Sequence, residues 1–386
     1  MNNIGPIRFK PYFKPVLWGG SRIAAFKGME PNDEPVGESW EISGLEGFVS
    51  VVAEGPYAGE TVESLLQKYG NDILGRNNYR IYGNKFPLLI KFIDASKDLS
   101  IQVHPDDFLA RERHGCWGKT ELWYTLDPEP GACVYSGLQS SITPSQLKEH
   151  IDNNTFSDVL AKFEAKRGDL FYLPAGRIHS IGAGNMILEI QQTSDITYRV
   201  YDYNRIDLNG KKRELHIDMA LDAIDFRVHE DYMRHIDPLV NREIVLKECP
   251  YFTATLITLD AKYRLQIARY NSFRIIIATR GCGEIVDNQG NRVAIRQGDT
   301  LLIPANTRWI DIVPTSADIE IVTAYIQYKR FIVCHAYIFL IPKTIWLSPL
   351  VAQTIRRRLM LLRCIMQVPH CLCFMAKGAI WLSDAK

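Results

Sequence analysis

One motif occurs twice in this chain, first at Gly168–His179 and again at Gly298–Trp309, with a constant offset between the copies. Each copy begins with Gly-Asp, continues with four largely apolar residues and then has Pro-Ala-Gly or Pro-Ala-Asn. Gly-Asp suits a tight turn, the apolar residues a buried strand, and the Gly or Asn a second turn with positive φ. Because each copy reads as turn, strand, turn, strand, the repeat predicts two β-barrels of one type.

The repeated pattern resembles the second motif of the cupin superfamily, whose members are small antiparallel jelly-roll barrels that commonly hold a metal ion. The first copy ends in His179, whereas the second ends in Trp309. We therefore expect a mainly β fold with two cupin-type jelly-roll β-barrels and a small helical insertion. We expect the first barrel to hold a metal and the second to have lost its ligand set.

Two domains and a tail follow from this pattern. Residues 1–240 are expected to form the metal-binding catalytic barrel, and residues 241–326 the second barrel, without metal. The first region includes helical insertions near 143–163 and 215–224. A helix start at Thr143 is indicated, because this N-cap threonine is followed by proline at the first helical position and glutamine at the third.

A strand with one polar face precedes a proline turn in the first region. Since strand side chains alternate between faces, Ser100, Gln102 and His104 share one side, while Ile101 and Val103 pack on the other. A polar face on such a strand needs partners. A structural histidine beside the turn is the simpler interpretation of His104 taken alone.

Three residues with metal-binding side chains fall on three predicted strand segments. Alternation places Lys119 and Glu121 on one strand face, and His179 ends the first copy of the repeat. Together with His104 these residues provide two imidazoles and one carboxylate, the usual set for a catalytic zinc with an open fourth position, and one that also holds Mn²⁺, Co²⁺ or Fe²⁺. Gln102 can add a fourth oxygen or orient a water. The alternative is structural: His179 caps a turn and Glu121 pairs with Lys119.

The chain as a whole resembles the type I phosphomannose isomerases, in their short bacterial form. The resemblance covers about residues 5–326. It is carried by six segments, Trp18–Gly20, Gly37–Ser43, Leu99–Asp107, Gly118–Trp123, Pro174–His179 and Gln192–Asp202.

This resemblance implies a zinc-dependent aldose–ketose isomerase that interconverts D-mannose 6-phosphate and D-fructose 6-phosphate through a cis-enediol(ate). It implies one Zn²⁺ per chain and the following site: metal ligands His104, Glu121 and His179; catalytic Arg199; and substrate-binding Ser100, Gln102 and Lys119. Longer members of the family also count the glutamine that matches Gln102 as a metal ligand, so both roles stay open for it.

The residues agree with the chemistry that such a reaction needs. A proton moves between C1 and C2 of the open-chain sugar, and the oxyanion that develops must be stabilised. Because its guanidinium stays protonated, Arg199 is interpreted as holding the enediolate or the phosphate by paired hydrogen bonds. Lys119, Glu41 or an acid near the metal are open alternatives for the proton shuttle. Lys97 is a further candidate for the phosphate.

Two other classes of function fit the same features. A protein with two cupin barrels can bind a sugar phosphate without catalysis, since fold does not fix function. The metal barrel can instead belong to a cupin oxygenase or to an epimerising enzyme that acts on another sugar. A turnover assay separates the first alternative, and oxygen uptake or product analysis separates the second.

Composition narrows the partners and the compartment. The formal net charge of +1, without a basic run interleaved with aromatics before residue 320, argues against a nucleic-acid partner and against membrane binding by residues 1–326. A small molecule, here a sugar phosphate, is the expected partner, and the oligomeric state stays open. Eight cysteines without a Cys-x-x-Cys pair, and no signal peptide at the start given, favour the cytoplasm. Lys91, inside an apolar run, is interpreted as a strand-end or edge residue.

Residues 327–386 differ from the rest of the chain. No Asp or Glu occurs between Ile321 and Ser383, while Lys, Arg and half of the cysteines gather there. Since the second barrel is complete by Ile326 in this interpretation, we expect the tail not to be an evolved part of the enzyme, for instance a frame-shifted continuation. The alternatives are an evolved membrane anchor and a partner-binding helix pair. The largely apolar Phe331–Val351 is long enough for an anchor, but Pro342 and Lys343 near its centre disfavour it.

Overall fold

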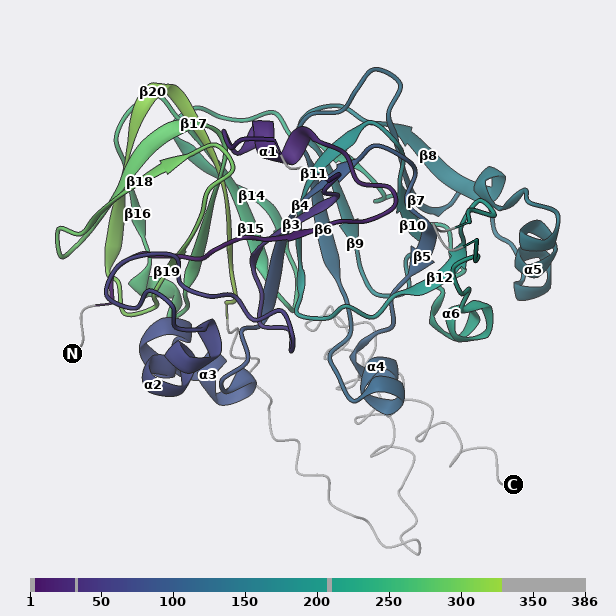
Figure 1. The fold of residues 1–386 in the computed structure, drawn as a ribbon, viewed down its shortest axis with the longest axis horizontal. Coiled ribbons are helices and arrows are strands. Elements are labelled where there is room, and N and C mark those ends of the chain that lie inside the picture. Colours follow the sequence, from purple (N-terminus) through teal and green to yellow (C-terminus); the bar gives the residue numbers. More distant parts are fainter. Residues whose placement is uncertain (1–3, 32–33, 207–209, 328–386) are drawn as a thin grey trace, which may run out of the picture. The chain divides into compact units, whose positions relative to one another are not determined.

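The computed structural model describes residues 4–31, 34–206 and 210–327, all of which belong to one compact unit, Met1–Lys329. Its strands pair antiparallel in three sheets (Figure 1), which confirms the predicted mainly β fold. The predicted atypical tail lies, beyond Gln327, outside the described residues. No helix in the described part of the chain is long and apolar enough to cross a membrane.

The first barrel consists of a seven-stranded and a five-stranded sheet. The first sheet has the order β13 (Arg234–His235), β9 (Asp169–Leu173), β6 (Glu121–Thr125), β11 (Asn185–Gln192), β4 (Leu88–Ala95), β3 (Glu38–Ile42) and β2 (Tyr12–Lys14). The second has the order β12 (Tyr198–Tyr201), β5 (Ile101–Val103), β10 (His179–Ile181), β7 (Cys133–Leu138) and β8 (Leu160–Glu164). Side chains of both sheets form one buried cluster that includes Trp123, Phe171 and Ile181.

The second barrel is built from one eight-stranded sheet. The main path runs β1 (Ile7–Arg8), β19 (Thr300–Ile303), β17 (Arg274–Asp287), β20 (Trp309–Tyr325), β15 (Thr253–Leu259) and β14 (Arg242–Glu248). Two further strands, β16 (Tyr263–Gln266) and β18 (Arg292–Arg296), pair with the far halves of β20 and β17. Along their two halves, β17 and β20 pair with different strands, β19 and β18 in the case of β17, and β16 and β15 in the case of β20. The resulting sheet encloses an apolar interior that is rich in isoleucine.

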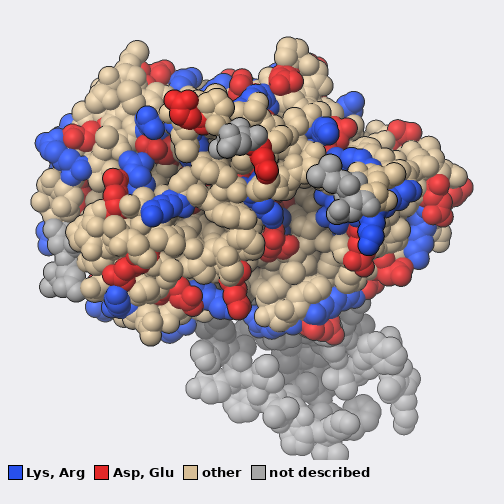
Figure 2. Space-filling view, viewed as in Figure 1, with Lys and Arg blue, Asp and Glu red and all other residues tan. Residues whose placement is uncertain are grey.

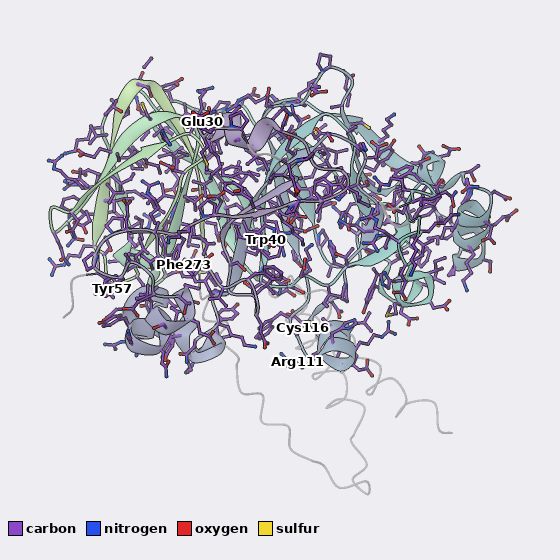
Figure 3. The ribbon with its side chains drawn as sticks, in the orientation of Figure 1. Glu30, Trp40, Tyr57, Arg111, Cys116 and Phe273 are labelled. Atoms are coloured by element: carbon purple, nitrogen blue, oxygen red, sulfur yellow. The ribbon has the colours of Figure 1, made fainter. Side chains whose placement is uncertain are left out.

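The boundary between the two barrels is crossed by the first strand of the chain. β1 pairs with β19, with Ile7 opposite Leu302, although it lies within the range 1–240 expected for the first barrel. A shared core also joins the barrels, in which the rings of Phe86 and Phe273 lie 5.1 Å apart (Figure 3 labels Phe273). The domain boundary at residue 240 therefore stays a prediction about folding units.

Helices are short and lie outside the sheets. They are α1 (Arg22–Phe26), α2 (Val62–Leu74), α3 (Arg76–Tyr82), α4 (Asp107–His114), α5 (Pro144–Asp152) and α6 (Ile217–Ala223), with 3₁₀ turns η1 (Phe156–Val159) and η2 (Ala268–Tyr270). α5 begins with the predicted capping box at Thr143. Both α5 and α6 contribute to the cluster that contains Ile101 and Val103, so the apolar face of β5 is covered as its alternation predicts.

The predicted helical insertion near 143–163 is partly wrong. α5 ends at Asp152, and the chain enters β8 at Leu160. β8 pairs with β7, where Phe163 lies opposite Val134. The apolar residues of this segment fit a helical period, but pairing with a neighbouring strand satisfies their backbone groups and determines the structure.

The two copies of the repeat adopt the predicted turns with one difference. Gly168 and Gly298 have φ values of +90° and +85°, and Gly176 has +89°. Asn306 is not among the described residues with positive φ. Its backbone N–H instead donates to the carbonyl of Asp72 in α2, so this turn is held against a helix.

The surface carries both signs of charge. Figure 2 shows Lys and Arg interspersed with Asp and Glu on the face in view. This agrees with the near-zero net charge of the sequence.

Candidate metal centre

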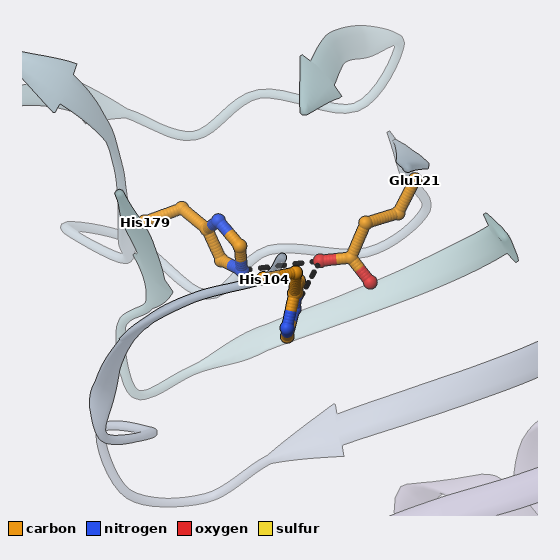
Figure 4. A group of neighbouring side chains, drawn as sticks. All are labelled: His104, Glu121 and His179. Atoms are coloured by element: carbon orange, nitrogen blue, oxygen red, sulfur yellow. Dashed lines mark hydrogen bonds and ion pairs between the residues drawn. The ribbon is translucent and has the colours of Figure 1, made fainter. Parts of the chain in front are cut away.

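His104, Glu121 and His179 meet inside the first barrel (Figure 4). His104 follows β5, Glu121 begins β6 and His179 begins β10, so three strands far apart in the sequence each bring one residue. Nε2 of His104 and Nε2 of His179 both lie 3.1 Å from Oε1 of Glu121. All three side chains are buried. Within the described ranges, this is the one group of three or more His, Cys, Asp or Glu residues arranged to hold a metal ion.

The other ring nitrogen of each histidine fixes which nitrogen carries the proton. Nδ1 of His104 lies 2.9 Å from the carbonyl oxygen of Ile196, and Nδ1 of His179 lies 2.8 Å from that of Arg177. A carbonyl oxygen only accepts hydrogen bonds, so each Nδ1 carries a hydrogen. In the neutral rings both Nε2 lone pairs therefore point towards the carboxylate of Glu121, and three acceptors converge without a donor.

The charge states of these residues suit a cation. Burial, followed by the charge of Lys119, lowers the pKa of His104 to about 3, so its ring is neutral. Burial raises the pKa of Glu121, but Lys119 and His104 outweigh it and hold this pKa well below its usual value. Oε2 of Glu121 and Nε2 of His179 are buried without a hydrogen-bond partner. Two imidazoles whose Nε2 atoms converge on one carboxylate provide a ligand set that fits a divalent metal ion.

A cavity of about 380 Å³ lies against this cluster. Its lining includes Gln102 and Lys119. Gln102 lies directly opposite His179 in the β5–β10 ladder, and Nζ of Lys119 lies 3.3 Å from Oε2 of Glu121. The polar strand face predicted from the sequence therefore forms one wall of the cavity next to the histidines.

Arg199 and Ser100 lie in the same lining. Nε of Arg199 donates to Oγ of Ser100 over 3.3 Å. Burial and then the charge of the nearby Arg213 lower the pKa of Arg199 from its ordinary value. A guanidinium nevertheless stays protonated at neutral pH. The structure thus brings together all seven site residues predicted from the sequence: three in the cluster and four in the cavity wall.

The interpretation of Lys91 as a strand-end or edge residue is wrong. Lys91 lies in the middle of β4, between β3 and β11, and its side chain lines the cavity. Its Nζ lies 3.1 Å from Glu189 and 3.4 Å from Glu38, and these carboxylates hold its pKa above the ordinary value despite burial. The two carboxylates compensate the charge of the ammonium group. Lys91 is therefore stable at the centre of a sheet, although an unpaired lysine is rarely buried.

Glu38 and Glu189 are further cavity residues that sequence reasoning missed. Each accepts from an indole N–H, Glu38 from Trp40 over 2.6 Å and Glu189 from Trp123 over 2.7 Å. Burial and the charge of Glu121 raise the pKa of Glu189. The available signal was one charged residue on each of three strands, Glu38 in β3, Lys91 in β4 and Glu189 in β11. Only the register between these strands shows that the three charges meet.

Two other candidates from the sequence do not reach the cavity. Glu41 accepts two bonds of 2.9 Å from Nζ of Lys27, which also contacts the carbonyl of Gly298 in the second barrel. Alternation along β3 places Glu41 on the face of Ser39, whose Oγ donates to it over 2.6 Å, and opposite to Glu38 in the cavity lining. Lys97 is exposed and lies outside the lining.

A larger and more open groove of about 950 Å³ is lined by the N-terminal strand and the β17–β18 hairpin. Arg8 in this groove is already paired with Glu54 and Asp299. The three ligand-type residues line neither cavity themselves, but Lys119 and Gln102, which adjoin them, line only the smaller one. The smaller cavity is therefore the chemical site.

Comparison with known proteins gives a consistent result. The family model described as phosphomannose isomerase type I, catalytic domain, matches residues 7–132. Mannose-6-phosphate isomerase ManA of Bacillus subtilis (strain 168) is 34% identical over 304 residues, covering 78% of this chain and 93% of that protein. Mannose-6-phosphate isomerase of Streptococcus mutans is 34% identical over 311 residues, covering 80% and 94%.

A solved structure agrees with these relatives. The crystal structure of mannose 6-phosphate isomerase from Bacillus subtilis matches with a TM-score of 0.71 at 31% identity, covering 84% of this chain and 100% of that one. On its sequence and its fold, this chain belongs to the type I phosphomannose isomerase family.

Proposed function

We propose that this chain interconverts D-mannose 6-phosphate and D-fructose 6-phosphate at the cavity of the first barrel. The observation that carries the proposal is the convergence of three metal-ligand atoms beside a cavity lined by Arg199 and by Lys119, whose Nζ lies 3.3 Å from Glu121. Family membership and the mannose-6-phosphate isomerase names of the relatives support the same substrate.

His104, Glu121 and His179 would hold the metal, which we propose to be one Zn²⁺ per chain. When bound, such an ion polarises the substrate carbonyl and stabilises negative charge on the neighbouring oxygen. The protein's own part is to orient both imidazoles through the carbonyls of Ile196 and Arg177, so that each Nε2 faces the metal position. Gln102, opposite His179, is assigned to the substrate or to the metal.

Arg199 is proposed as the catalytic residue. Its guanidinium, held beside Ser100, offers paired N–H donors to an enediolate oxygen or to the phosphate. Ser100 and Lys119 are proposed to bind the phosphate, and the same lining contains Arg213 as a further cation. Fixed donors in a buried cavity stabilise developing charge more strongly than water does.

The proton shuttle must line this cavity, because it has to reach the hydrogen that moves between C1 and C2. Glu41 does not line it, whereas Lys119 does. Lys119 therefore remains a candidate, and the acids of the wall, Glu38, Glu189 and Asp195, take the place of Glu41.

The domain division and the compartment are part of the same proposal. Residues 1–240 are assigned to catalysis, and residues 241–326 to a second barrel without metal. Four cysteines in the described part of the chain are free thiols, Cys116, Cys133, Cys249 and Cys282. Free thiols are usual in a reducing compartment, which supports the cytoplasm.

Isomerase assays of the purified chain test the proposal. We expect turnover of mannose 6-phosphate, and we expect Arg199→Ala to lower kcat and kcat/KM together by about 100-fold, as removal of a donor used in the transition state does. Arg280→Ala on the second barrel is the matched control, because its ion pair with Asp318 is exposed. A fall in affinity alone, with kcat unchanged, would contradict the role of Arg199.

A further inference from the structure

Among the strands that the structure describes, the one that carries Arg199 has a neighbour on one side only. β12 is the end strand of its sheet and pairs with β5, where Arg199 lies opposite Gln102. The outward backbone groups of an end strand need partners other than a sheet. The position of the Arg199 side chain therefore depends on what covers the open edge of β12.

The segment just before α6 covers that edge with three hydrogen bonds to this one residue. The backbone N–H of Arg199 donates to Nδ1 of His216 over 3.1 Å. The backbone N–H of His216 donates to the carbonyl of Arg199 over 2.7 Å. The guanidinium Nη1 of Arg199 donates to the carbonyl of Glu214 over 2.9 Å.

We propose that His216, in its neutral form, is a positioning residue that holds Arg199 for isomerisation. This inference rests on the proposed function. His216 bonds both outward backbone groups of Arg199 and so replaces a neighbouring strand at that point. Its ring does not line the cavity, so it acts through Arg199 and not on the substrate.

The hydrogen-bond pattern requires one protonation state. An N–H of the backbone needs an acceptor, so Nδ1 of His216 must carry no hydrogen and the ring proton must lie on Nε2. A protonated ring would place N–H against N–H and break the contact. Burial, followed by the charge of Arg199, lowers the pKa of His216 from its ordinary value of 6.5 and so favours the state that the contact needs.

The charged and titratable groups around this ring come from several elements. Arg199 and Tyr198 approach from β12, Glu214 from the same loop, and His114 from α4. Glu214 favours the protonated ring, whereas Arg199 and His114 oppose it. His114 is itself bonded to the hydroxyl of Tyr198 over 2.8 Å. The cationic surroundings outweigh the single carboxylate.

The direction of the pH dependence follows. The contact is complete above about pH 6.5, the pKa of a free histidine, and is lost as the pH falls through the lowered pKa of His216. Asparagine is the diagnostic replacement, because its Oδ1 can accept the same bond and does not titrate. Alanine removes the acceptor and leaves the backbone bond from residue 216.

The test compares the zinc-loaded full-length chain with His216→Asn and His216→Ala between pH 5 and pH 8. We expect His216→Ala to lower kcat by about 10-fold or more at pH 7.5, the scale of a small misplacement of a catalytic group. We expect His216→Asn to retain most of the activity and to lose less of it below pH 6.5 than the wild type. His150→Ala, a half-buried histidine in α5, is the matched control.

Hydrogen exchange of the Arg199 amide gives a second readout that does not depend on activity. We expect protection in the wild type and in His216→Asn, and faster exchange in His216→Ala at unchanged melting temperature. Equal exchange in all three proteins, or an acid limb in His216→Asn identical to that of the wild type, would overturn the inference. If the wild type shows no isomerase activity, the proposed function fails, while the exchange rates still decide whether His216 holds Arg199.

Discussion

Arg274 in the second barrel occupies the position that Glu121 occupies in the first. Glu121 pairs with Leu173 in the β6–β9 ladder, and Arg274 pairs with Ile303 in the β17–β19 ladder. Leu173 and Ile303 are equivalent members of the repeated motif. The same comparison along the strands makes Trp123 equivalent to Ile276.

The neighbouring strands extend this equivalence across the sheet. Following the ladders gives three more pairs: Glu189 with Thr323, Lys91 with Thr255, and Glu38 with Glu243. Even the irregularity of the outer strand recurs, because the register shifts after Trp40 in β3 and after Val245 in β14. The two barrels thus carry polar side chains at the same places of one sheet pattern.

The second barrel neutralises its polar layer from within the chain. The guanidinium of Arg274 contacts Glu243 and donates to Thr255 over 3.0 Å and to Thr323 over 2.8 Å. It also lies 4.2 Å from the ring centroid of Tyr325. One buried cation therefore reaches across the positions that four charged residues hold in the first barrel.

The difference shows what makes the first barrel a site. There Lys119 pairs with one oxygen of Glu121, while the other oxygen faces Nε2 of two histidines, an arrangement that fits a metal ion. In the second barrel the cation Arg274 occupies the position of Glu121 itself. The histidine of the repeat is replaced as well, since Trp309 stacks against the guanidinium of Arg264 at 3.6 Å. Variants at equivalent positions should therefore have opposite consequences in the two barrels.

Loss of the metal should have the largest effect and should be confined to the first barrel. We expect exhaustive chelation, or His179→Ala, to lower isomerase activity by about 1,000-fold or more, as loss of Lewis-acid stabilisation worth several kcal/mol implies. Zinc should restore the chelated wild type but not the variant. Trp309→Phe is the matched control at the equivalent position, and activity that survives full chelation would break the comparison.

Arg274→Met should have the next largest effect, on stability and not on chemistry. It leaves Glu243 without its buried partner, so we expect a loss of about 3 kcal/mol in the free energy of unfolding. Urea denaturation measures this loss, and kcat of the folded protein should stay unchanged. Arg280→Met, which removes a partly exposed pair, should cost well under about 1 kcal/mol. Equal costs for both variants would show that Arg274 is not the internal cation.

Thr255→Val should have the smallest effect of the three. The variant keeps the shape and removes one hydroxyl that bonds to Arg274, Glu243 and Thr323, so we expect a loss of about 1 kcal/mol. Denaturation midpoints and zinc content check it. Zinc content should not change, because this hydroxyl bonds to Arg274 in the second barrel. If the variant bound less zinc, the polar residues of the two barrels would be coupled, and the comparison would fail.

The cluster was predictable because each of its residues stands in an unusual local context. His179 ends the first copy of the repeated motif, at the place where the second copy has Trp309. His104 and Glu121 occupy polar faces of short strands. Lys91 was misjudged because its partner Glu189 is distant in sequence, and the pairing depends on the register of β4 against β11. Register follows from the packing of whole sheets, which a local pattern does not contain.

The position of Arg274 was hidden for a related reason. The repeat can be recognised in the sequence only at Gly168–His179 and Gly298–Trp309, where turns require particular residues. Strand positions accept many side chains of suitable size, so β6 and β17 share a place in the fold without sharing a pattern. The contact of His216 with Arg199 escaped prediction because one half-buried residue in a loop leaves no periodic signal.

The pairing of β1 with β19 bears on how the protein is made. Ile7 is synthesised long before its partner Leu302, which lies in the last strands of the second barrel. Contacts of such long sequence separation form slowly, and segments that wait for them stay exposed. The first barrel can assemble its ligands from residues 104–179 while the N-terminal strand is still unpaired. Pairing with β19 in the second barrel then fixes the N-terminal strand.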